Sequence, residues 1–454
     1  MSLAVVNVLT ILFSVISIKI VYSKKIISEH DMGKLVFANV LFRHGDRTPL
    51  NPYPTDPYRN VSFWPVGFGQ LTNLGKEQEY ELGQWLRHRY DALLTDTYSE
   101  NVVYVRSTDV DRCLMSAASN LAAIYPPKGS QKWNPKLNWQ PIPIHTVPEH
   151  EDSVLSGKKP CPAYDREMER VLKSPEIQAL NEKFADVFKV LNEHTGRKAT
   201  SLKDVEYVYD TLLIETLHNF TLPAWTKSIY PEPMMEASKY SFALSTWTEK
   251  LARLKSGLLV KDMIDHLHKK SENKAKPNRN MWIYSAHDST ISSLLNTLGV
   301  FDLQIPDYAS AVLMELRVDP QGNHQVTMLL RNSTIHEPYL LTLPGCTPVC
   351  PLDTFLELCE AVVPLDWERE CQASSLFDMA HALPYRDLST TALVTSSLLV
   401  LLLLLSATLY WQRSRRRIHW YHANLRLTVY SLPLVNLYSE FLSCIVIGLN
   451  EFPQ

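Results

Sequence analysis

The stretch KLVFANVLFRHGDR, residues 34–47, predicts a buried strand that ends abruptly at charged residues. The same pattern recurs at residues 101–109, where NVVYV precedes RSTD, and at residues 281–290, where MWIYSA precedes HDST. In open α/β sheets, ligands bind in the crevice outside the carboxyl ends of the strands. We therefore expect these three polar clusters, which are far apart in the sequence, to meet in one crevice.

The segments around these strands predict the rest of the fold. Thr72 is placed to cap an amphipathic helix that follows the first strand. Residues 150–275 are rich in Lys and Glu at helical spacing and predict a smaller inserted helical domain. Residues 311–318 and 325–331 alternate as antiparallel strands do. Because strands and helices alternate at both ends of this region, we expect an α/β fold with a mostly parallel central sheet flanked by helices.

Two apolar stretches near the chain ends predict the compartment. Residues 1–23 open with an uncharged run and predict a cleaved signal peptide, with an uncleaved anchor as the alternative. Residues 388–410 carry no charge and are long enough for a single C-terminal transmembrane helix. The Arg-rich segment that follows predicts a cytoplasmic tail over residues 411–454. The chain is thus expected to be a type I membrane protein with residues 24–386 on the lumenal or extracellular side.

Charge, glycosylation signals and cysteines agree with that compartment. A net charge of −3 over 454 residues lacks the basic footprint of a protein that binds nucleic acid. Three Asn-X-Ser/Thr triplets predict glycosylation at Asn60, Asn219 and Asn332. Seven cysteines fit an oxidising compartment. Two pairs could form disulfides, Cys346 with Cys350 across a small loop and Cys161 with Cys371 between distant segments.

The residues at the three strand ends suit a phosphate ligand. They combine several cations with one nearby carboxylate, and they are Arg43, His44, Arg47, Arg106, Arg112, His287 and Asp288. Arginine presents a planar fork of donors to phosphate oxygens. The spacing alone leaves open whether Arg106 or Arg112 contributes. A charged turn held by local ion pairs is the alternative for one such cluster, but it does not account for three at matching strand ends.

His44 is the candidate nucleophile, because its imidazole can attack phosphorus and divide hydrolysis into two easier steps through a phosphohistidine. Asp288 can protonate the leaving oxygen and later accept a proton from water. His287 can add a hydrogen-bond donor or a positive charge against the phosphoryl oxygens. The sequence lacks the residues that cysteine-dependent, two-metal and Gly-rich-loop chemistries need, so we expect no metal and no cofactor.

The motifs RHGDRTP at residues 43–49 and SAHD at residues 285–288 resemble the two signatures of the histidine acid phosphatase family, in its membrane-anchored prostatic and lysosomal branch. The likeness runs from about residue 34 to residue 371. It implies an α/β core with a smaller helical domain, and hydrolysis of phosphate monoesters at acid pH without a metal. It implies His44 as nucleophile and Asp288 as proton donor. The residues that it places around the phosphate are Arg43, Arg47, Arg112 and His287, so it favours Arg112 over Arg106.

The resemblance also implies features outside the site. It implies a homodimer, to whose interface three residues correspond, namely Asp109, Trp139 and His145. The pairs Cys161–Cys371 and Cys346–Cys350 match two of the family's three disulfides, whereas Ile214 and Ala311 stand where the third would be. Cys113 and Cys359 are additional and are expected to be buried thiols. The expected location is the lysosome or the plasma membrane.

The sequence therefore predicts an acid phosphatase that acts on phosphate monoesters. Narrower alternatives are an ecto-nucleotidase and a phosphatase of lysophospholipids or phosphoproteins. A non-catalytic surface glycoprotein that keeps the pocket only for binding is the alternative outside the enzymes. Loss of His44 or Asp288 would mark that alternative, and both residues are present.

Overall fold

The computed structural model describes residue 29, residues 31–372, residues 404–406 and residue 408. The predicted signal peptide and cytoplasmic tail lie outside these residues. So does the predicted transmembrane segment 388–410, apart from residues 404–406 and 408, which are helical. Within the described residues, no helix combines the length and the hydrophobicity needed to cross a bilayer.

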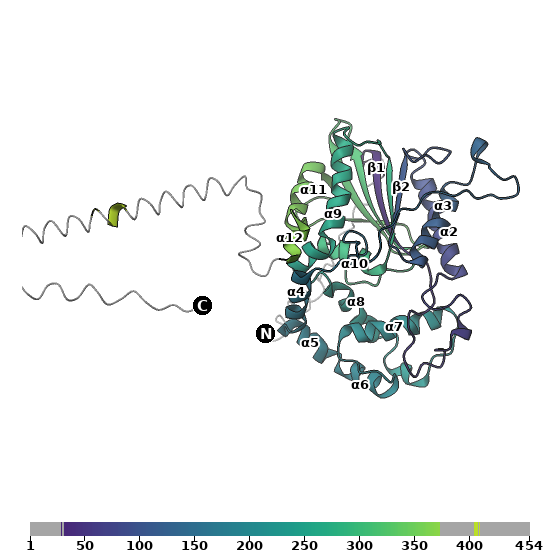
Figure 1. The fold of residues 1–454 in the computed structure, drawn as a ribbon, viewed down its shortest axis with the longest axis vertical. Helices are drawn as coiled ribbons and strands as arrows, with labels where there is room; N and C mark the ends of the chain where they lie inside the picture. Colours follow the sequence, from purple (N-terminus) through teal and green to yellow (C-terminus); the bar gives the residue numbers. More distant parts are fainter. Residues whose placement is uncertain (1–28, 30, 373–403, 407, 409–454) are drawn as a thin grey trace, which may run out of the picture. The chain divides into compact units, whose positions relative to one another are not determined.

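A seven-stranded sheet forms the centre of the fold (Figure 1). Its strands are β1 (Lys34–Arg43), β2 (Val103–Ser107), β3 (Met281–Ala286), β4 (Ala311–Val318), β5 (His324–Arg331), β6 (Tyr339–Leu341) and β7 (Val349–Pro351). The order across the sheet is β2-β3-β1-β4-β5-β6, and β7 also pairs with β5. The strands predicted before the three polar clusters are thus confirmed as β1, β2 and β3, and they are neighbours.

The prediction of a mostly parallel sheet is wrong, because the sheet is mixed. β2, β3 and β1 run parallel, whereas β4 is antiparallel to β1 and β5 is antiparallel to β4, β6 and β7. The reason lies in the connections. Helices link β1 to β2 and β2 to β3, but β4 and β5 are joined by a turn at residues 319–323, and so short a connection allows only antiparallel pairing.

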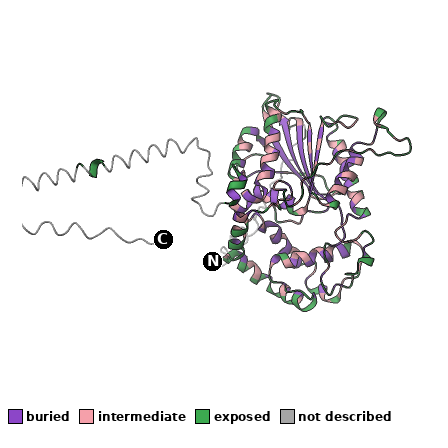
Figure 2. Cartoon of the chain, viewed as in Figure 1, coloured by how far each residue is buried: buried purple, intermediate pink, exposed green. Residues whose placement is uncertain are grey.

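Helices cover both faces of the sheet. On one face lie α2 (Asn73–Arg89) and α3 (Asp111–Ile124), and on the other lie α9 (Glu249–Ser271), α10 (Asp288–Thr297) and α11 (Leu352–Cys359). Side chains of β1 alternate between two apolar clusters, with Val40 and Phe42 facing the α2 side and Phe37 and Leu41 the α9 side. The strands are accordingly the most buried part of the chain (Figure 2). As predicted, Thr72 caps α2, and its hydroxyl accepts a hydrogen bond from Gly75 N at 3.1 Å.

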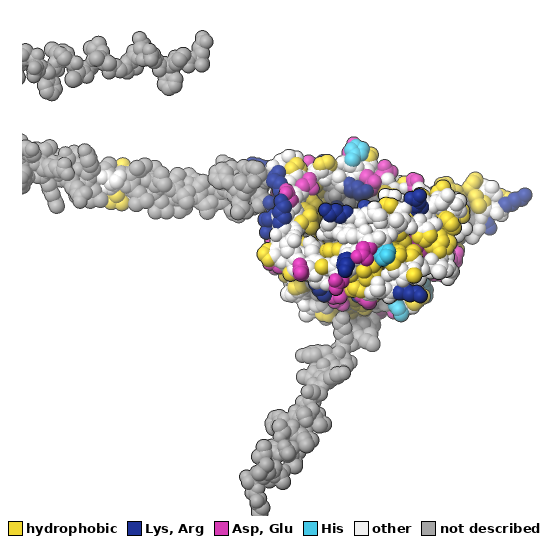
Figure 3. Space-filling view, turned by 90° about the horizontal axis from the view of Figure 1, so that it is seen from below, with side chains coloured by type: hydrophobic (Ala, Val, Ile, Leu, Met, Phe, Trp, Pro, Cys, Tyr) yellow, Lys and Arg dark blue, Asp and Glu magenta, His cyan; other side chains and the backbone are white. Residues whose placement is uncertain are grey.

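A helical segment between β2 and β3 forms its own apolar core beside the sheet (Figure 1). Its helices are α4 (Pro162–Leu172), α5 (Pro175–Lys183), α6 (Ala185–His194), α7 (Leu202–Leu217) and α8 (Met234–Leu244), and α9 then returns to the sheet. Short 3₁₀ turns occupy Val61–Phe63, Gly129–Gln131, Ala224–Ser228 and Glu360–Val362. On the face seen from below, where the helical segment lies, basic, acidic and apolar side chains are intermixed (Figure 3).

Both expected disulfides are present. Cys161–Cys371 joins the start of α4 to α12 (Trp367–Gln372), and Cys346–Cys350 closes the loop before β7. Where the third family disulfide would be, Ile214 and Ala311 are fully buried apolar residues. Cys113 and Cys359 are buried free thiols, as expected.

Candidate active site

The carboxyl ends of β1, β2 and β3 meet at one edge of the sheet. Arg43 pairs with Ala286 across β1 and β3, and Ser107 pairs with Ser285 across β2 and β3. The residues that follow each strand therefore emerge side by side, and His44 N donates to Ala286 O at 3.0 Å. They line a cavity of about 290 Å³, whose walls include Arg43, His44, Arg47, Arg112, His287 and Asp288.

The structure separates the two arginines that the spacing left open. Arg112, in the first turn of α3, lines the cavity. Arg106 instead pairs with the buried carboxylate of Asp152, with 2.7 Å between Nη2 and Oδ1. It does not line the cavity. Because strand side chains alternate between faces, a residue still inside β2 points to a helix-covered face rather than beyond the strand end.

His44 is buried and lines the cavity. Its Nδ1 lies 2.8 Å from Gly45 O, which can only accept, so Nδ1 carries the proton and Nε2 keeps its lone pair. Burial first, and then the charges of Arg112 and Arg43, hold the pKa of His44 well below its usual value of 6.5. The lowered pKa favours the neutral imidazole, which is the form that can act as a nucleophile.

A glycine contact fixes the loop that carries His44. A Cβ placed on Gly45 would lie 2.2 Å from Gly75 O at the start of α2, so only glycine fits this approach. Gly45 N also donates to Ser116 Oγ of α3 at 3.1 Å. The loop is thus held directly against both helices that cover this face of the sheet, and His44 has little room to move.

Three guanidinium groups surround the cavity. Arg43 Nη2 lies 2.8 Å from Asp288 Oδ2, and its Cζ stacks 4.0 Å above the centre of the Tyr308 ring. Arg47 Nη2 lies 3.0 Å from Asp210 Oδ1 of α7. The Nε–H groups of the three arginines (Arg43, Arg47 and Arg112) are buried and find no acceptor among the described residues. Three positive charges that line one cavity and present planar forks of donors favour an anion that supplies oxygen acceptors.

His287 and Asp288 occupy the cap and the first position of α10. His287 Nε2 lies 3.0 Å from Thr108 Oγ1, and burial together with the charge of Arg112 lowers the pKa of His287 to about 3. Asp288 Oδ1 accepts from Ser289 N at 2.6 Å. Although burial opposes ionisation, the charges of Arg43 and Arg47 lower the pKa of Asp288 to about 2.

The structure adds residues that sequence reasoning missed. Asp210 holds Arg47, and three lysines line the same cavity, namely Lys158, Lys203 and Lys255. All of them come from the helical segment, α9 or the loop before α4, where no motif marked them. Asp46 faces away from the cavity, and its buried Oδ2 lies 2.9 Å from His218 Nε2. The described residues contain no group of three His, Cys, Asp or Glu placed to hold a metal ion.

The other predicted residues lie outside the cavity. Asn60 and Asn219 are exposed, and Asn332 is half-buried with its Nδ2 donating to Gln304 Oε1 at 2.8 Å. The residues predicted at a dimer interface are all exposed, namely Asp109, Trp139 and His145. His145 also stacks on Tyr104, with 4.5 Å between ring centres.

The chain is similar to known proteins over the part that forms the sheet and the cavity. The model of the histidine phosphatase superfamily (branch 2) matches residues 34–331. Human prostatic acid phosphatase is 43% identical over 348 residues, which cover 75% of this chain and 89% of that protein. Human lysosomal acid phosphatase is 42% identical over 349 residues, which cover 75% of this chain and 81% of that protein.

The fold is also found among solved structures. Phytase from Citrobacter braakii superposes with a TM-score of 0.57 at 17% sequence identity, covering 75% of this chain and all of that one. Hafnia alvei phytase in its apo form gives a TM-score of 0.58 at 18% identity, covering 75% and 98%. At such low identity these structures support the fold alone. The match of the family model and the identity to the acid phosphatases go further: this chain belongs to the histidine phosphatase superfamily, branch 2.

Proposed function

We propose that this acid phosphatase hydrolyses phosphate monoesters with His44 as its nucleophile and Asp288 as its proton donor. The observation that carries the proposal is the state of His44. Its Nε2 lone pair is free because Nδ1–H is bonded to Gly45 O at 2.8 Å, and its pKa is lowered, first by burial. A neutral imidazole among three arginines can attack a phosphorus atom whose negative oxygens those arginines bind.

In the first step, Arg43, Arg47 and Arg112 bind the phosphoryl oxygens and spread their charge. The bond from His44 Nε2 to phosphorus forms while the bond from phosphorus to the ester oxygen breaks. Asp288 gives its proton to that oxygen, which leaves as an alcohol. His287 stays neutral at acid pH because its pKa is lowered to about 3 by burial and Arg112. Of the two roles expected from the sequence, a hydrogen-bond donor or a positive charge, His287 therefore has the first.

In the second step, water replaces the alcohol. The Asp288 carboxylate takes a proton from the water as its oxygen attacks phosphorus, and the bond between phosphorus and Nε2 breaks. Inorganic phosphate leaves, and both side chains return to their starting states. No step needs a metal ion or a cofactor.

The role of Asp288 requires its carboxyl group to be protonated when substrate is bound. In the free protein its pKa is about 2, because Arg43 and Arg47 outweigh the opposing effect of burial. A bound phosphate dianion shares those arginines and adds negative charge beside the carboxylate. Both effects raise the pKa of Asp288, which supports proton donation in the bound state and an optimum at acid pH.

His44→Ala tests the proposal. The variant should lose turnover of p-nitrophenyl phosphate together with the labelled phosphoenzyme that acid quenching traps from the wild-type protein. His150→Ala is a matched control, because His150 is exposed and outside the cavity, and it should retain both signals. Labelled phosphoenzyme in His44→Ala would identify another nucleophile and overturn the proposal. Loss of activity on addition of EDTA would overturn the metal-free mechanism.

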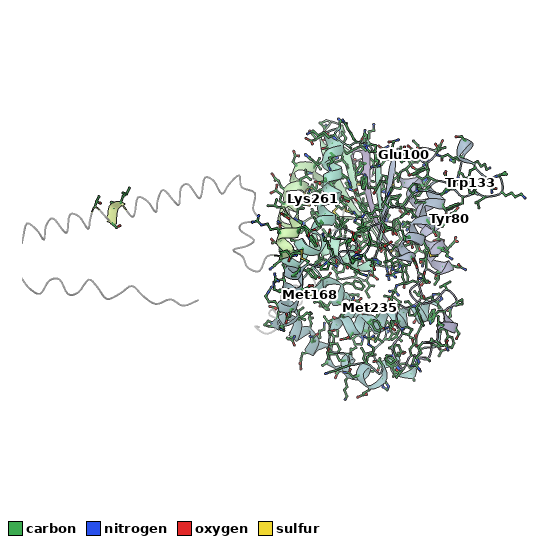
Figure 4. The ribbon with its side chains drawn as sticks, in the orientation of Figure 1. Tyr80, Glu100, Trp133, Met168, Met235 and Lys261 are labelled. Carbon is green, nitrogen blue, oxygen red and sulfur yellow. A yellow bond between two sulfur atoms is a disulfide. The ribbon has the colours of Figure 1, made fainter. Side chains whose placement is uncertain are left out.

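The same proposal covers location and assembly. We propose a type I membrane protein of the lysosome or cell surface whose catalytic region forms a homodimer through Asp109, Trp139 and His145. The exposure of these residues supports the dimer, as does the projecting loop of residues 126–146, which carries Trp133 with 58% of its side chain exposed (Figure 4). An exposed tryptophan is typical of an interaction surface. Sedimentation of wild-type protein and Trp139→Ala tests the dimer.

A further inference from the structure

The active-site cavity contains a second group of positive charges that the proposed reaction does not use. Lys158, Lys203 and Lys255, the lysine cluster, line the same cavity as His44. They lie on three different elements: the loop before α4, the first turn of α7, and α9. Lys158 and Lys203 are well exposed, unlike the deeply buried Arg43 and Arg47. Lys158 and Lys203 therefore lie at the mouth of the cavity and the arginines at its base, whereas Lys255 is half-buried.

The charges of the lysine cluster are only partly neutralised. Lys158 Nζ pairs with Glu149 at 2.6 Å, and Lys203 Nζ pairs with Glu206 at 2.6 Å. Lys255 Nζ donates to a backbone oxygen, Gly157 O, at 2.9 Å, and no carboxylate of the described residues pairs with it. Burial, followed by the charges of the other two lysines, lowers the pKa of Lys255. Three ammonium groups that repel one another at a cavity mouth form a favourable position for an anion.

Two serines beside this position indicate which side of the reaction it serves, although the Ser156 hydroxyl already donates to backbone oxygens. Ser156 and Ser289 line the cavity, and together with Lys255 they also line a small recess that opens from it. Ser289 directly follows Asp288, the proposed proton donor to the leaving group. Against the effect of burial, the charges of Glu206 and Asp288 raise the pKa of Lys203, so the lysine cluster lies near the proposed proton donor, on the side where the alcohol part of the substrate departs.

We propose that the lysine cluster binds a second phosphate group on the leaving group, so that small compounds with two phosphate groups are preferred substrates. This inference rests on the proposed function, because it takes Asp288 to mark the leaving-group side. One phosphate lies among the arginines and is transferred to His44. The other lies between Lys255, Lys158 and the Ser289 hydroxyl, and departs with the alcohol.

The apolar lining residues of the cavity supply the competing outcome. They are Leu50, Leu213, Phe242 and Ile305. A leaving group held by these residues alone would be a hydrocarbon or an aromatic ring. The lysine cluster thus predicts a preference for a leaving group that carries a second anion, whereas the apolar residues predict a preference for an uncharged leaving group.

The test compares butyl phosphate with 4-phosphonobutyl phosphate on the full chain. The two compounds have the same scissile phosphate, and the carbon–phosphorus bond of the phosphonate cannot be hydrolysed, so each offers one reacting group. We expect wild-type protein to prefer the phosphonate compound about tenfold in kcat/KM, the size of one charge-assisted contact. The preference should fall as salt is added, because exposed charges are screened.

Lys255→Gln and Lys158→Gln should each remove most of that preference. Lys189→Gln is the matched control, because Lys189 is exposed on α6 and outside the cavity, and it should retain the wild-type preference. Equal kcat/KM for the two compounds, a preference for butyl phosphate, or an undiminished preference in Lys255→Gln would each overturn the inference. Failure of the proposed function would be seen differently, as wild-type protein that turns over neither compound and forms no phosphoenzyme.

Discussion

Replacing Asp288 by asparagine separates proton donation from phosphate binding. The carboxylate lies 2.8 Å from Arg43 Nη2 and accepts from Ser289 N at 2.6 Å. Asparagine keeps the size of the side chain, and its amide oxygen can keep one of these contacts, but it has no acidic proton to give. General acid catalysis contributes about 10²–10⁴-fold where the leaving group needs a proton. At about 1.4 kcal/mol for each factor of ten, this is about 3–5 kcal/mol of the barrier.

The leaving group decides how much of that loss appears. Butanol leaves as a strongly basic alkoxide unless it is protonated, so Asp288→Asn should lower kcat/KM for butyl phosphate by about 10²–10⁴-fold. The p-nitrophenolate anion is stable without a proton, so kcat/KM for p-nitrophenyl phosphate should fall by no more than about tenfold. The comparison uses kcat/KM because this ratio reports the first step, whereas kcat also includes the second step, in which Asp288 accepts a proton whichever alcohol has left. The assay is initial-rate kinetics on both compounds at acid pH, with folding checked by thermal unfolding.

Asp210→Asn is the control for charge. Asp210 also pairs with a cavity arginine, since its Oδ1 lies 3.0 Å from Arg47 Nη2, but it has no proposed part in proton transfer. Removing its charge should change both substrates by the same factor. Equal losses of kcat/KM on the two compounds in Asp288→Asn would mean that Asp288 acts only by holding Arg43, and the assignment of the proton donor would be refuted.

Three further substitutions test the surroundings of the site. Arg112→Met should raise the pKa of His44, because Arg112 is the largest cause of its depression after burial, and an NMR titration of the ring that shows no rise would contradict this. The hydrogen bond to Asp46 raises the pKa of His218 in the folded protein. This pair therefore stabilises the fold fully below about pH 6.5, the pKa of histidine in an unfolded chain, and the stabilisation is lost as the pH rises through the pKa of His218 in the folded protein. His218→Gln should therefore cost about 1 kcal/mol more unfolding free energy at pH 5 than at pH 9, measured by urea unfolding, and an equal cost at both would count against the pair. Gly45→Ala should destabilise the protein by about 1–3 kcal/mol, because its Cβ would lie 2.2 Å from a backbone oxygen of α2, and an unchanged Tm would contradict that contact.

The positions of the reacting residues could be predicted because they depend on a local pattern. An apolar run that stops at Arg43 or His287 marks a strand end, and parallel strands place such ends at one edge of the sheet. The choice between Arg106 and Arg112 needed the resemblance to the histidine acid phosphatase family, because both arginines follow the apolar run of residues 101–105 in the sequence. In the structure, the difference is that Arg106 is still within β2, whereas Arg112 is in α3.

Features that depend on long-range packing could not be predicted from the sequence. The antiparallel pairing of β4 with β5 agrees with the expectation from their alternation, but the antiparallel pairing of β4 with β1 depends on where the chain leaves α10, which the local sequence does not show. The cavity-lining lysines were missed for a related reason. Lys203 and Lys255 stand among many other lysines at helical spacing, and only the tertiary fold distinguishes those at the cavity from those in solvent.

The cavity is assembled from two parts of the chain, the strand ends of the sheet and the helices that follow β2. Strand ends of the sheet carry His44 and Asp288, whereas α7, α8 and α9 supply much of the wall that a leaving group would touch. Amino-acid changes confined to those helices can alter which alcohol fits while the reacting atoms stay in place, apart from the support that Asp210 gives to Arg47. Proteins of this fold that keep the proposed two-step chemistry can therefore differ in substrate specificity through changes in these helices alone.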